Sequence, residues 1–307
     1  MNDKISVIMA AYNCEKTVGK AIDSILAQTY ENWVMIICDD GSTDGTMDVL
    51  NHYAGEYPDK LVIIQNETNS KLPYSLNHCL QYVQTELVAR MDGDDWSTPD
   101  RFEKQVAFLK AHPEYDLVST GVTVHDGEKP IASIIKIPEP NRETVLKQNP
   151  FSHATIMTYK RVYDALGGYS LDPTALRVED AELWFRFLAA GFRGYNMPDE
   201  LYVMVENIEA VKRRTLRSRI NGATTANRGL RLLGYRGWVC WKPYLNILKY
   251  FVPTAIYRKI HKHRLISKKI QCSETLDFRI LPGELICRRN IITQNTTSIS
   301  HERGCVA

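Results

Sequence analysis

Short apolar runs alternate with segments of helical periodicity over the first 120 residues, and this alternation constrains the fold more than any other feature of the chain. Ile5–Ala11 is apolar on both faces, as is typical of a strand buried inside a parallel sheet. The strands expected after it are 33–38, 61–65, 87–91 and 116–122, and the helices expected between them are 17–28, 46–53, 74–83 and 102–111. Strands and helices in this order indicate an α/β sandwich with a mostly parallel sheet.

Acidic clusters follow two of the expected strands. Asp39–Asp40 ends the strand at 33–38, and Asp92–Asp95 follows the strand at 87–91. Ligands of open α/β sheets bind beyond the carboxyl ends of the strands. We therefore expect the two clusters to face one crevice.

The charge distribution divides the chain into three parts. Residues 1–211 carry 18 Lys and Arg against 32 Asp and Glu, whereas residues 212–269 carry 16 Lys and Arg and no acid. An abrupt change of this kind indicates that the two parts meet different partners. We predict a catalytic domain at 1–210, a basic, aromatic-rich helical segment at 211–269, and a poorly defined tail at 270–307.

The sharpest chemical feature is the sequence Arg90-Met91-Asp92-Gly93-Asp94-Asp95, which places three carboxylates within four positions. Clustered carboxylates raise one another's pKa and need a compensating cation. Mg²⁺ or Mn²⁺ suits this role, since such ions keep phosphate oxygens among their ligands. The alternative is a solvated acidic loop that caps the following helix. Because a second acidic loop is expected to face this one, we favour the metal site.

The segment Asp39–Thr46 reads as a turn that caps the next helix through Ser42, Thr43 or Asp44. That arrangement leaves Asp39 or Asp40 free to accept the imide N–H of uracil or a ribose hydroxyl. No G-x-G-x-x-G or Walker A pattern follows any expected strand, which argues against a dinucleotide or P-loop site.

Glu179 and Asp180 stand at the start of a further expected helix, 180–190. Acids at this position commonly serve the helix dipole alone. A carboxylate fixed at a helix start is also well placed to act as a general base toward a hydroxyl. Asp180 is a candidate for that role.

Taken in order, the segments ISVIMAAYN, DDGSTDGT, ARMDGDDWSTPDRF, FSHATIM, GGY and VEDAELWFR resemble those of glycosyltransferase family 2, inverting enzymes of the GT-A fold. The likeness extends to the O-antigen and capsule polysaccharide transferases of that family. It spans residues 5 to about 190. The family therefore implies a GT-A nucleotide-binding sandwich as the fold of the catalytic domain.

The resemblance also implies roles for matched residues on the donor side. The residues expected to bind the nucleotide sugar are Ala10, Ala11, Tyr12, Asp40, Arg90, Asp92 and Asp95. Asp92 and Asp94 form the D-x-D motif that holds Mn²⁺ or Mg²⁺ as cofactor. The stretch before this motif, which includes Lys71 and Leu72, differs from that of many relatives.

On the acceptor side, the resemblance implies that Asp180 is the catalytic base, with Glu179 as its neighbour. Two further candidates are His153, in the FSHATIM loop, and Trp184, in the helix that follows Asp180.

The basic segment interleaves its charges with aromatic residues, which are Trp238, Trp241, Tyr244, Tyr250, Phe251 and Tyr257. Such a pattern suits helices that lie on an anionic membrane surface. The same segment could instead pack on the acidic domain or bind nucleic acid; we favour the membrane surface and expect no nucleic acid partner. No apolar run of 18 residues occurs, and the seven Cys show no C-x-x-C spacing. We therefore expect a cytoplasmic protein, peripheral on the inner face of the membrane.

The sequence as a whole predicts an inverting, metal-dependent transferase. Its donor would be a nucleotide-diphosphate sugar, with UDP favoured, and its acceptor a saccharide carried on a polyprenyl diphosphate lipid during surface polysaccharide assembly. Two alternatives are a nucleotidyltransferase of similar fold and a non-catalytic protein that binds nucleotide sugars. The first would be expected to carry a Gly-rich loop after the first strand, where this chain has Ala-Ala-Tyr-Asn.

Overall fold

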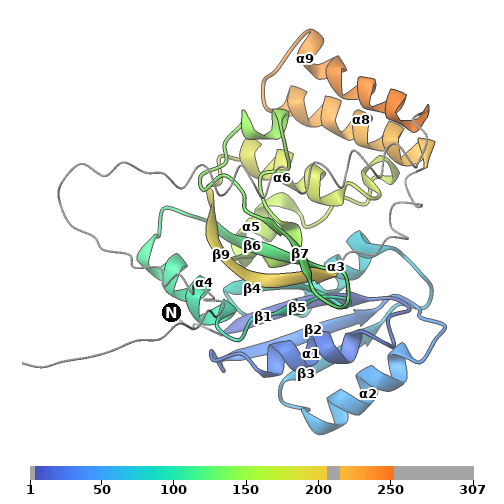
Figure 1. Ribbon diagram of the computed structural model, residues 1–307, viewed down its shortest axis with the longest axis vertical. Helices are drawn as coiled ribbons and strands as arrows, with labels where there is room; N and C mark the ends of the chain where they lie inside the picture. Colours follow the sequence, from blue (N-terminus) through green and yellow to red (C-terminus); the bar gives the residue numbers. More distant parts are fainter. Residues whose placement is uncertain (1–3, 206–214, 252–307) are drawn as a thin grey trace, which may run out of the picture.

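A computed structural model describes residues 4–205 and 215–251, and within them nine strands form one curled sheet through the centre of the molecule (Figure 1). The strand order is β3-β2-β1-β4-β8-β6-β9-β5, with β7 paired to β6. The strands are β1 (Ile5–Ala11), β2 (Trp33–Asp39), β3 (Leu61–Gln65), β4 (Leu87–Asp92), β5 (Trp96–Ser97), β6 (Leu117–His125), β7 (Pro130–Ile134), β8 (Met157–Tyr159) and β9 (Gly194–Val205).

Helices cover both faces of the sheet. They are α1 (Val18–Leu26), α2 (Thr46–Glu56), α3 (Leu72–Gln81), α4 (Arg101–Ala111), α5 (Lys160–Leu166), α6 (Glu179–Ala189), α8 (Leu216–Leu232) and α9 (Trp238–Trp241), with 3₁₀ turns at Thr144–Leu146, His153–Thr155, Pro173–Ala175 and Lys242–Phe251. The predicted α/β sandwich is confirmed, and the expected strands and helices are present with ends shifted by a few residues. None of the described helices combines the length and the apolar content needed to cross a bilayer.

The half of the sheet formed by β1 to β4 is parallel throughout, and its register positions the acidic residues. Ala10 of β1 pairs with Asp92 of β4, and Ala11 pairs with Asp39 of β2. The carboxyl ends of three strands therefore meet at one edge. The shared edge that the sequence predicts for the two acidic clusters is confirmed.

The other half of the sheet is mixed and was not predicted beyond β6. β8 runs antiparallel to both β4 and β6, whereas β9 is parallel to β6. The register of β6 against β9 shifts around Gly121, where Pro198 and Asp199 approach closely. In an irregular strand of this kind, apolar and polar residues do not alternate regularly, and so the sequence pattern does not predict β9.

Alternate side chains of the buried strands pack into two separate hydrophobic cores, one on each face of the sheet. In β1, Val7 and Met9 face the layer of α1, α2 and α4, while Ile8 faces the layer of α3, α5 and α6. Both faces of β1 are therefore buried, which explains why all its residues but Ser6 are apolar; the Ser6 hydroxyl is hydrogen-bonded to Thr85 (2.8 Å). Each fully buried aliphatic side chain contributes about 1.5–3 kcal/mol to folding.

The first helix of the basic segment, α8, packs on α6 at the end of the molecule opposite α2 (Figure 1). Gly229 lies against the ring of Phe185, so close that an added Cβ would stand 2.1 Å from its Cγ. The hydroxyl of Thr225 also donates to the backbone oxygen of Thr174 (2.9 Å), and Arg228 pairs with Asp172 (2.8 Å). Internal packing, one of the alternatives for the basic segment, thus applies to α8. Residues 252–269 of the basic segment and the tail at 270–307 lie outside the described residues.

This contact predicts opposite signs for two glycine substitutions in the same helix. Gly229→Ala should lower the free energy of unfolding by about 1–3 kcal/mol, because the new methyl group overlaps Phe185. Gly222→Ala is the matched control, since its Cβ would meet Val178 at an ordinary 3.5 Å. That variant should gain up to about 1 kcal/mol from helix propensity. Urea denaturation of both variants measures the difference, and equal shifts would contradict the packing described.

Candidate active site

A cleft of about 1030 Å³ opens at the carboxyl edge of the parallel strands. Its walls include six of the residues singled out from the sequence: Ala10, Tyr12, Asp40, Asp92, Asp94 and Glu179. They come from the ends of β1, β2 and β4 and from the start of α6. Groups that lie far apart in the chain are therefore gathered around one space.

Asp40 is buried at the end of β2, and its carboxylate holds the loop at 66–71 against the cleft. It accepts hydrogen bonds from the backbone N–H of Ser70 (2.8 Å) and of Lys71 (2.9 Å), and from the side-chain amide of Asn66 (2.8 Å). An ionised carboxylate offers about four acceptor positions, so about one remains for a ligand. Asp39 is fully buried behind it and does not line the cleft.

The loops that follow β1 and β2 are tied together. The side-chain oxygen of Asn13 accepts from the backbone N–H of Thr43 (2.9 Å), and Glu15 accepts from that of Gly45 (2.8 Å). Asp44 accepts from the N–H and the hydroxyl of Thr46, at 3.1 and 2.6 Å. Of the three residues expected to cap α2, Asp44 therefore makes the bonds to Thr46 at the helix start.

Arg90 is buried beneath the acidic loop at 92–95 and is hydrogen-bonded to Asp92. Its two terminal nitrogens donate to the two carboxylate oxygens at 2.6 and 3.0 Å. Burial alone would lower the pKa of Arg90, but the charge of Asp92 raises it above its ordinary value. The guanidinium is thus charged, and its two hydrogen bonds hold Asp92 at a fixed angle at the cleft wall. Arg90 itself does not line the cleft.

A second buried arginine, Arg101, supports the same strand end. Its guanidinium donates to the backbone oxygen of Arg90 (2.9 Å) and to the hydroxyl of Ser97 (2.9 Å). Burial lowers its pKa to about 10, and it remains charged at neutral pH. The sequence pattern assigns no role to Arg101, although the residue lies near the end of the segment ARMDGDDWSTPDRF, which also contains the acidic motif.

The two remaining acids of the motif point in different directions. Asp94 is exposed and lines the cleft. Asp95 is buried and accepts from the Tyr202 hydroxyl (3.0 Å) and from the Val205 N–H (2.8 Å). Burial raises its pKa to about 8, and the charges of Asp92 and Asp94 add to the rise. Asp95 was expected among the nucleotide-sugar contacts; instead it bonds the loop to β9, because its side chain faces the interior of the fold.

Glu179 and Asp180 begin α6; Glu179 lines the cleft, whereas Asp180, which follows it in the chain, is not among the lining residues. One oxygen of Asp180 accepts from the side-chain amide of Asn149 (2.6 Å), which fixes the carboxylate. Burial raises the pKa of both groups. Arg177, two residues before Glu179, adopts a left-handed backbone, with φ of 67°, and lines the cleft together with Leu176.

His153 and Trp184 form a layer behind the cleft and do not line it. The Nε2 atom of His153 lies 2.8 Å from the hydroxyl of Tyr169, and burial lowers the pKa of the imidazole well below its usual value. Trp184 is 1% exposed and packs edge-on against His153 and Phe151. Both were expected on the acceptor side; burial limits Trp184 to supporting its neighbours. Ala11, expected to contact the nucleobase, is likewise buried within β1.

The cleft also contains cations to which the sequence pattern assigns no role. Lys16, Lys71 and Arg177 all line it. Lys71 and Arg177 both have left-handed backbones, with φ of 78° and 67°, which non-glycine residues rarely adopt. Isolated basic residues in an acidic stretch of sequence were the available signal. Their charges suit an anionic ligand that spans the cleft.

The carboxylates present fit a metal ion that is shared with a ligand. In the described parts of the chain, no group of three His, Cys, Asp or Glu side chains is arranged to enclose a metal. The D-x-D motif supplies two carboxylates, Asp92 and Asp94, to the wall of the cleft. Ions such as Mg²⁺ commonly take one or two carboxylates and fill their other positions with water and phosphate oxygens. The donor set therefore fits a cation bound together with a phosphate-bearing ligand.

Comparison with known proteins agrees with this geometry. The model of the family described as glycosyl transferase family 2 matches residues 6–166. The putative glycosyltransferase EpsE of Bacillus subtilis is 42% identical over 272 residues, covering 87% of this chain and 96% of EpsE. WfaP of Escherichia coli, a UDP-Glc:alpha-D-GlcNAc-diphosphoundecaprenol beta-1,3-glucosyltransferase, is 28% identical and covers 64% of this chain and 76% of its own.

Among solved structures, the mannosyltransferase PcManGT from Pyrobaculum calidifontis, in complex with GDP-Man and Mn²⁺, superposes with a TM-score of 0.56. The match covers 89% of this chain and 76% of that one at 20% identity. At this identity the likeness concerns the fold alone.

Proposed function

Because the chain belongs to glycosyl transferase family 2, we propose that it transfers a sugar from a nucleotide diphosphate to a saccharide hydroxyl with inversion at the anomeric carbon. One observation carries this proposal. Asp40, Asp94 and Glu179, from three separate elements, line a single cleft that also contains three cations. A nucleotide, its diphosphate and an acceptor hydroxyl need these groups in one place.

On the donor side, the end of β1 and Asp40 receive the nucleoside. The exposed ring of Tyr12 provides an apolar face for the base, and the remaining acceptor position of Asp40 suits a base or ribose N–H or O–H. Lys71 and Arg177 offset the diphosphate charge. Asp94, with Asp92 beside it, would hold Mn²⁺ or Mg²⁺, which when bound neutralises charge on the departing diphosphate.

On the acceptor side, Asp180 takes the proton of the attacking hydroxyl. Asn149 holds one of its oxygens, and burial raises its pKa, which strengthens it as a base. Glu179 lies next to it on the cleft wall. The hydroxyl attacks from the face opposite the nucleotide, so an α-linked donor gives a β-linked product.

The names of relatives support the choice of substrates. WfaP is named for a UDP-sugar donor and a diphosphoundecaprenol-linked acceptor. For this chain we propose a UDP-sugar and a saccharide carried on a polyprenyl diphosphate, used in the assembly of a surface polysaccharide.

Substitution of the proposed base gives the first test. Asp180→Asn should lower kcat by about 10²–10⁴-fold, since transfer then lacks its proton acceptor. In wild type, kcat/KM should fall with decreasing pH through a pKa above the ordinary Asp value, because the base must be ionised and burial raises its pKa. A raised pKa also means that the ionised carboxylate costs stability above that pKa. Asp180→Asn should therefore unfold at the same or a higher temperature than wild type at neutral pH.

Glu179→Gln is the matched variant, changing the neighbouring acid by the same chemistry. It should retain measurable transfer. If Asp180→Asn transfers normally while Glu179→Gln does not, the base is Glu179.

The donor and the metal are tested by thermal stabilisation with UDP, GDP and their sugars, with and without Mn²⁺. UDP and a UDP-sugar should raise the melting temperature, and Mn²⁺ should increase the shift. Asp94→Asn should lose the part that depends on Mn²⁺ and keep its fold, because Asp94 is exposed. Asp59→Asn, an exposed acid between α2 and β3, is the control. Stabilisation by GDP in place of UDP would reject the donor proposed here.

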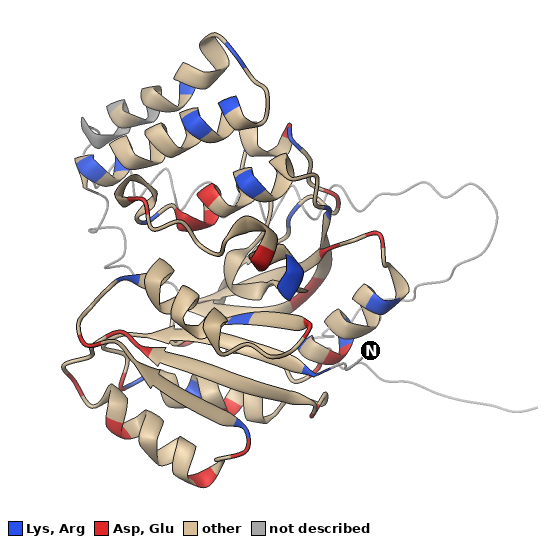
Figure 2. Ribbon diagram, turned by 180° about the vertical axis from the view of Figure 1, so that it is seen from behind, with Lys and Arg blue, Asp and Glu red and all other residues tan. Residues whose placement is uncertain are grey.

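We further propose that the end of the basic segment binds an anionic membrane surface from the cytoplasmic side. Trp238 is 67% exposed and Trp241 is 52% exposed, and Leu245 is exposed nearby. Figure 2 shows basic but no acidic positions on α8, and in the sequence Arg236 and Lys242 flank α9. Exposed indoles flanked by Lys and Arg suit the headgroup region of a bilayer. A lipid-linked acceptor would then reach the enzyme in the plane of the membrane.

Flotation with vesicles of phosphatidylcholine, with or without phosphatidylglycerol, tests this surface. Wild type should float with the anionic vesicles and dissociate as NaCl is raised, because salt screens the basic residues. Replacing Trp238 and Trp241 by Ala should reduce partitioning roughly tenfold. Tyr57→Ala, at an exposed aromatic on the opposite end of the molecule, should have no effect. Binding that ignores lipid charge would refute the proposal.

A further inference from the structure

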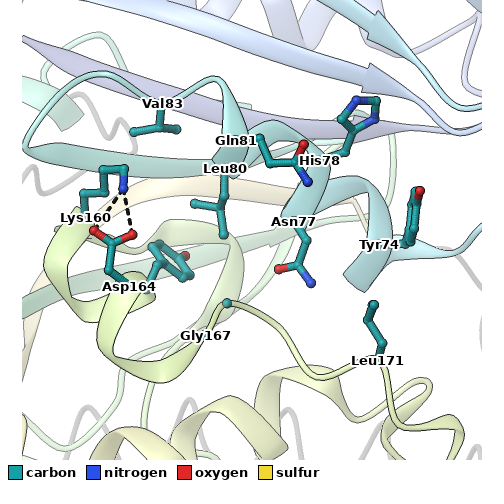
Figure 3. A pocket seen from close by; sticks show the side chains of 12 residues that line it. Tyr74, Asn77, His78, Leu80, Gln81, Val83, Lys160, Asp164, Gly167 and Leu171 are labelled. Atoms are coloured by element: carbon teal, nitrogen blue, oxygen red, sulfur yellow. Dashed lines mark hydrogen bonds and ion pairs between the residues drawn. The ribbon is translucent and has the colours of Figure 1, made fainter.

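A second cavity, of about 730 Å³, lies between α3 on one side and α5 with the turn after it on the other (Figure 3). α3 contributes Tyr74, Asn77, His78 and Gln81 to its lining. No role in the transfer proposed above falls on these residues. The volume is within the range of ligand pockets, about 300–1,000 Å³.

The lining is electrically neutral and mixes polar with apolar groups. Its Lys160 and Asp164 pair with each other at 2.6 Å, which leaves no uncompensated charge to attract a phosphate or a nucleotide. Tyr74 presents an exposed aromatic ring, and Leu171, on the opposite side, is also exposed (Figure 3). Within the described residues, the Tyr74 hydroxyl and the Gln81 amide make no hydrogen bond. A ligand with apolar ring faces and many hydroxyl groups matches these features.

The cavity is built rigidly. The side-chain amide of Asn77 donates to the backbone oxygen of Tyr169 (2.8 Å) and accepts from its N–H (2.8 Å). Gly168, before it, has a φ of 72°, and a Cβ there would stand 2.5 Å from the Asn77 side chain. The turn that forms one wall is therefore locked to α3 before any ligand arrives.

The two walls of this cavity continue into the catalytic cleft. Leu72 and Pro73, at the start of α3, line the cleft, and Tyr74 follows them into the cavity. On the other wall, Leu171 lines the cavity, and Leu176 lines the cleft. The same two segments, the first turns of α3 and the stretch 167–177, therefore contribute lining residues to both the cavity and the cleft.

A hydrogen-bond chain also joins the two spaces. His78, in the cavity, lies 2.8 Å from the side-chain oxygen of Asn66, whose amide donates to Asp40 in the cleft (2.8 Å). The wall between them is therefore a connected polar network rather than a loose layer.

We propose that this cavity is a subsite for the saccharide acceptor, which receives sugar rings beyond the one that carries the attacking hydroxyl. Tyr74 stacks on the face of one ring, and Gln81 bonds to its hydroxyls. The enzyme thereby extends an oligosaccharide rather than a single sugar. This inference rests on the transfer reaction proposed above.

The test measures binding of defined mono-, di-, tri- and tetrasaccharides of glucose, galactose, mannose and N-acetylglucosamine in the presence of UDP and Mn²⁺, by calorimetry or ligand-observed NMR. At least one oligosaccharide should bind more tightly than its monosaccharide. Tyr74→Ala should weaken that oligosaccharide about tenfold and leave the monosaccharide unchanged, as expected from the loss of one aromatic contact. UDP binding, followed by thermal shift, should not change.

Tyr82→Ala is the matched control, because Tyr82 is 47% exposed at the end of the same helix, close to the 46% of Tyr74, and does not line the cavity. If UDP binds but no oligosaccharide binds better than its monosaccharide, or if both tyrosine variants lose affinity equally, the subsite is refuted and the transfer reaction stands. If UDP does not bind, the donor proposal fails independently of the cavity.

Discussion

The candidate site depends on a buried guanidinium. Arg90 lies beneath the acidic loop, makes two charge-assisted bonds to Asp92, and influences the pKa of Glu179 and Asp180 through its charge. Without it, carboxylates from two elements would repel one another in a partly dry space. Arg90 is the buried partner of this pair, at 3% exposed against 31% for Asp92, so the guanidinium depends on the carboxylate for compensation of its charge. Arg101 supports the backbone of Arg90 from behind, so two buried cations underlie one acidic cleft.

The parallel half of the fold and the gathering of acids at its edge were predictable, because they follow from local pattern. Buried parallel strands are apolar on both faces, and their ends must meet in the register that pairs Ala10 with Asp92. The roles of Asp95 and Arg101 were not predictable in this way. Their partners lie in β9 and β4, and no spacing in the sequence reports which acid of a motif faces inward. The backbones of Lys71 and Arg177 are left-handed where these residues line the cleft. Lys and Arg rarely adopt this conformation, so their positions could not be predicted from residue type.

The acidic catalytic domain at 1–210 and the basic segment are joined by specific packing as well as by their opposite charges. α8 rests on α6 through the close fit of Gly229 on Phe185. Thr225, Arg228 and Asn221 bond to the segment 172–174, which leads through Arg177 to the proposed base. The exposed indoles of α9 follow directly in the chain. A surface suited to a bilayer and a residue suited to proton transfer are thus anchored to the same short stretch.

The inward orientation of Asp95 changes how the acidic motif should be read in other chains. Asp95 joins the loop to Tyr202 and Val205 of β9, and these two hydrogen bonds serve the fold whether or not the cleft binds a ligand. Asp94, in contrast, is exposed on the wall of the cleft. In a comparison across relatives, retention of the third acid would therefore report the architecture of the loop, whereas retention or loss of the second would bear on the cation site proposed here.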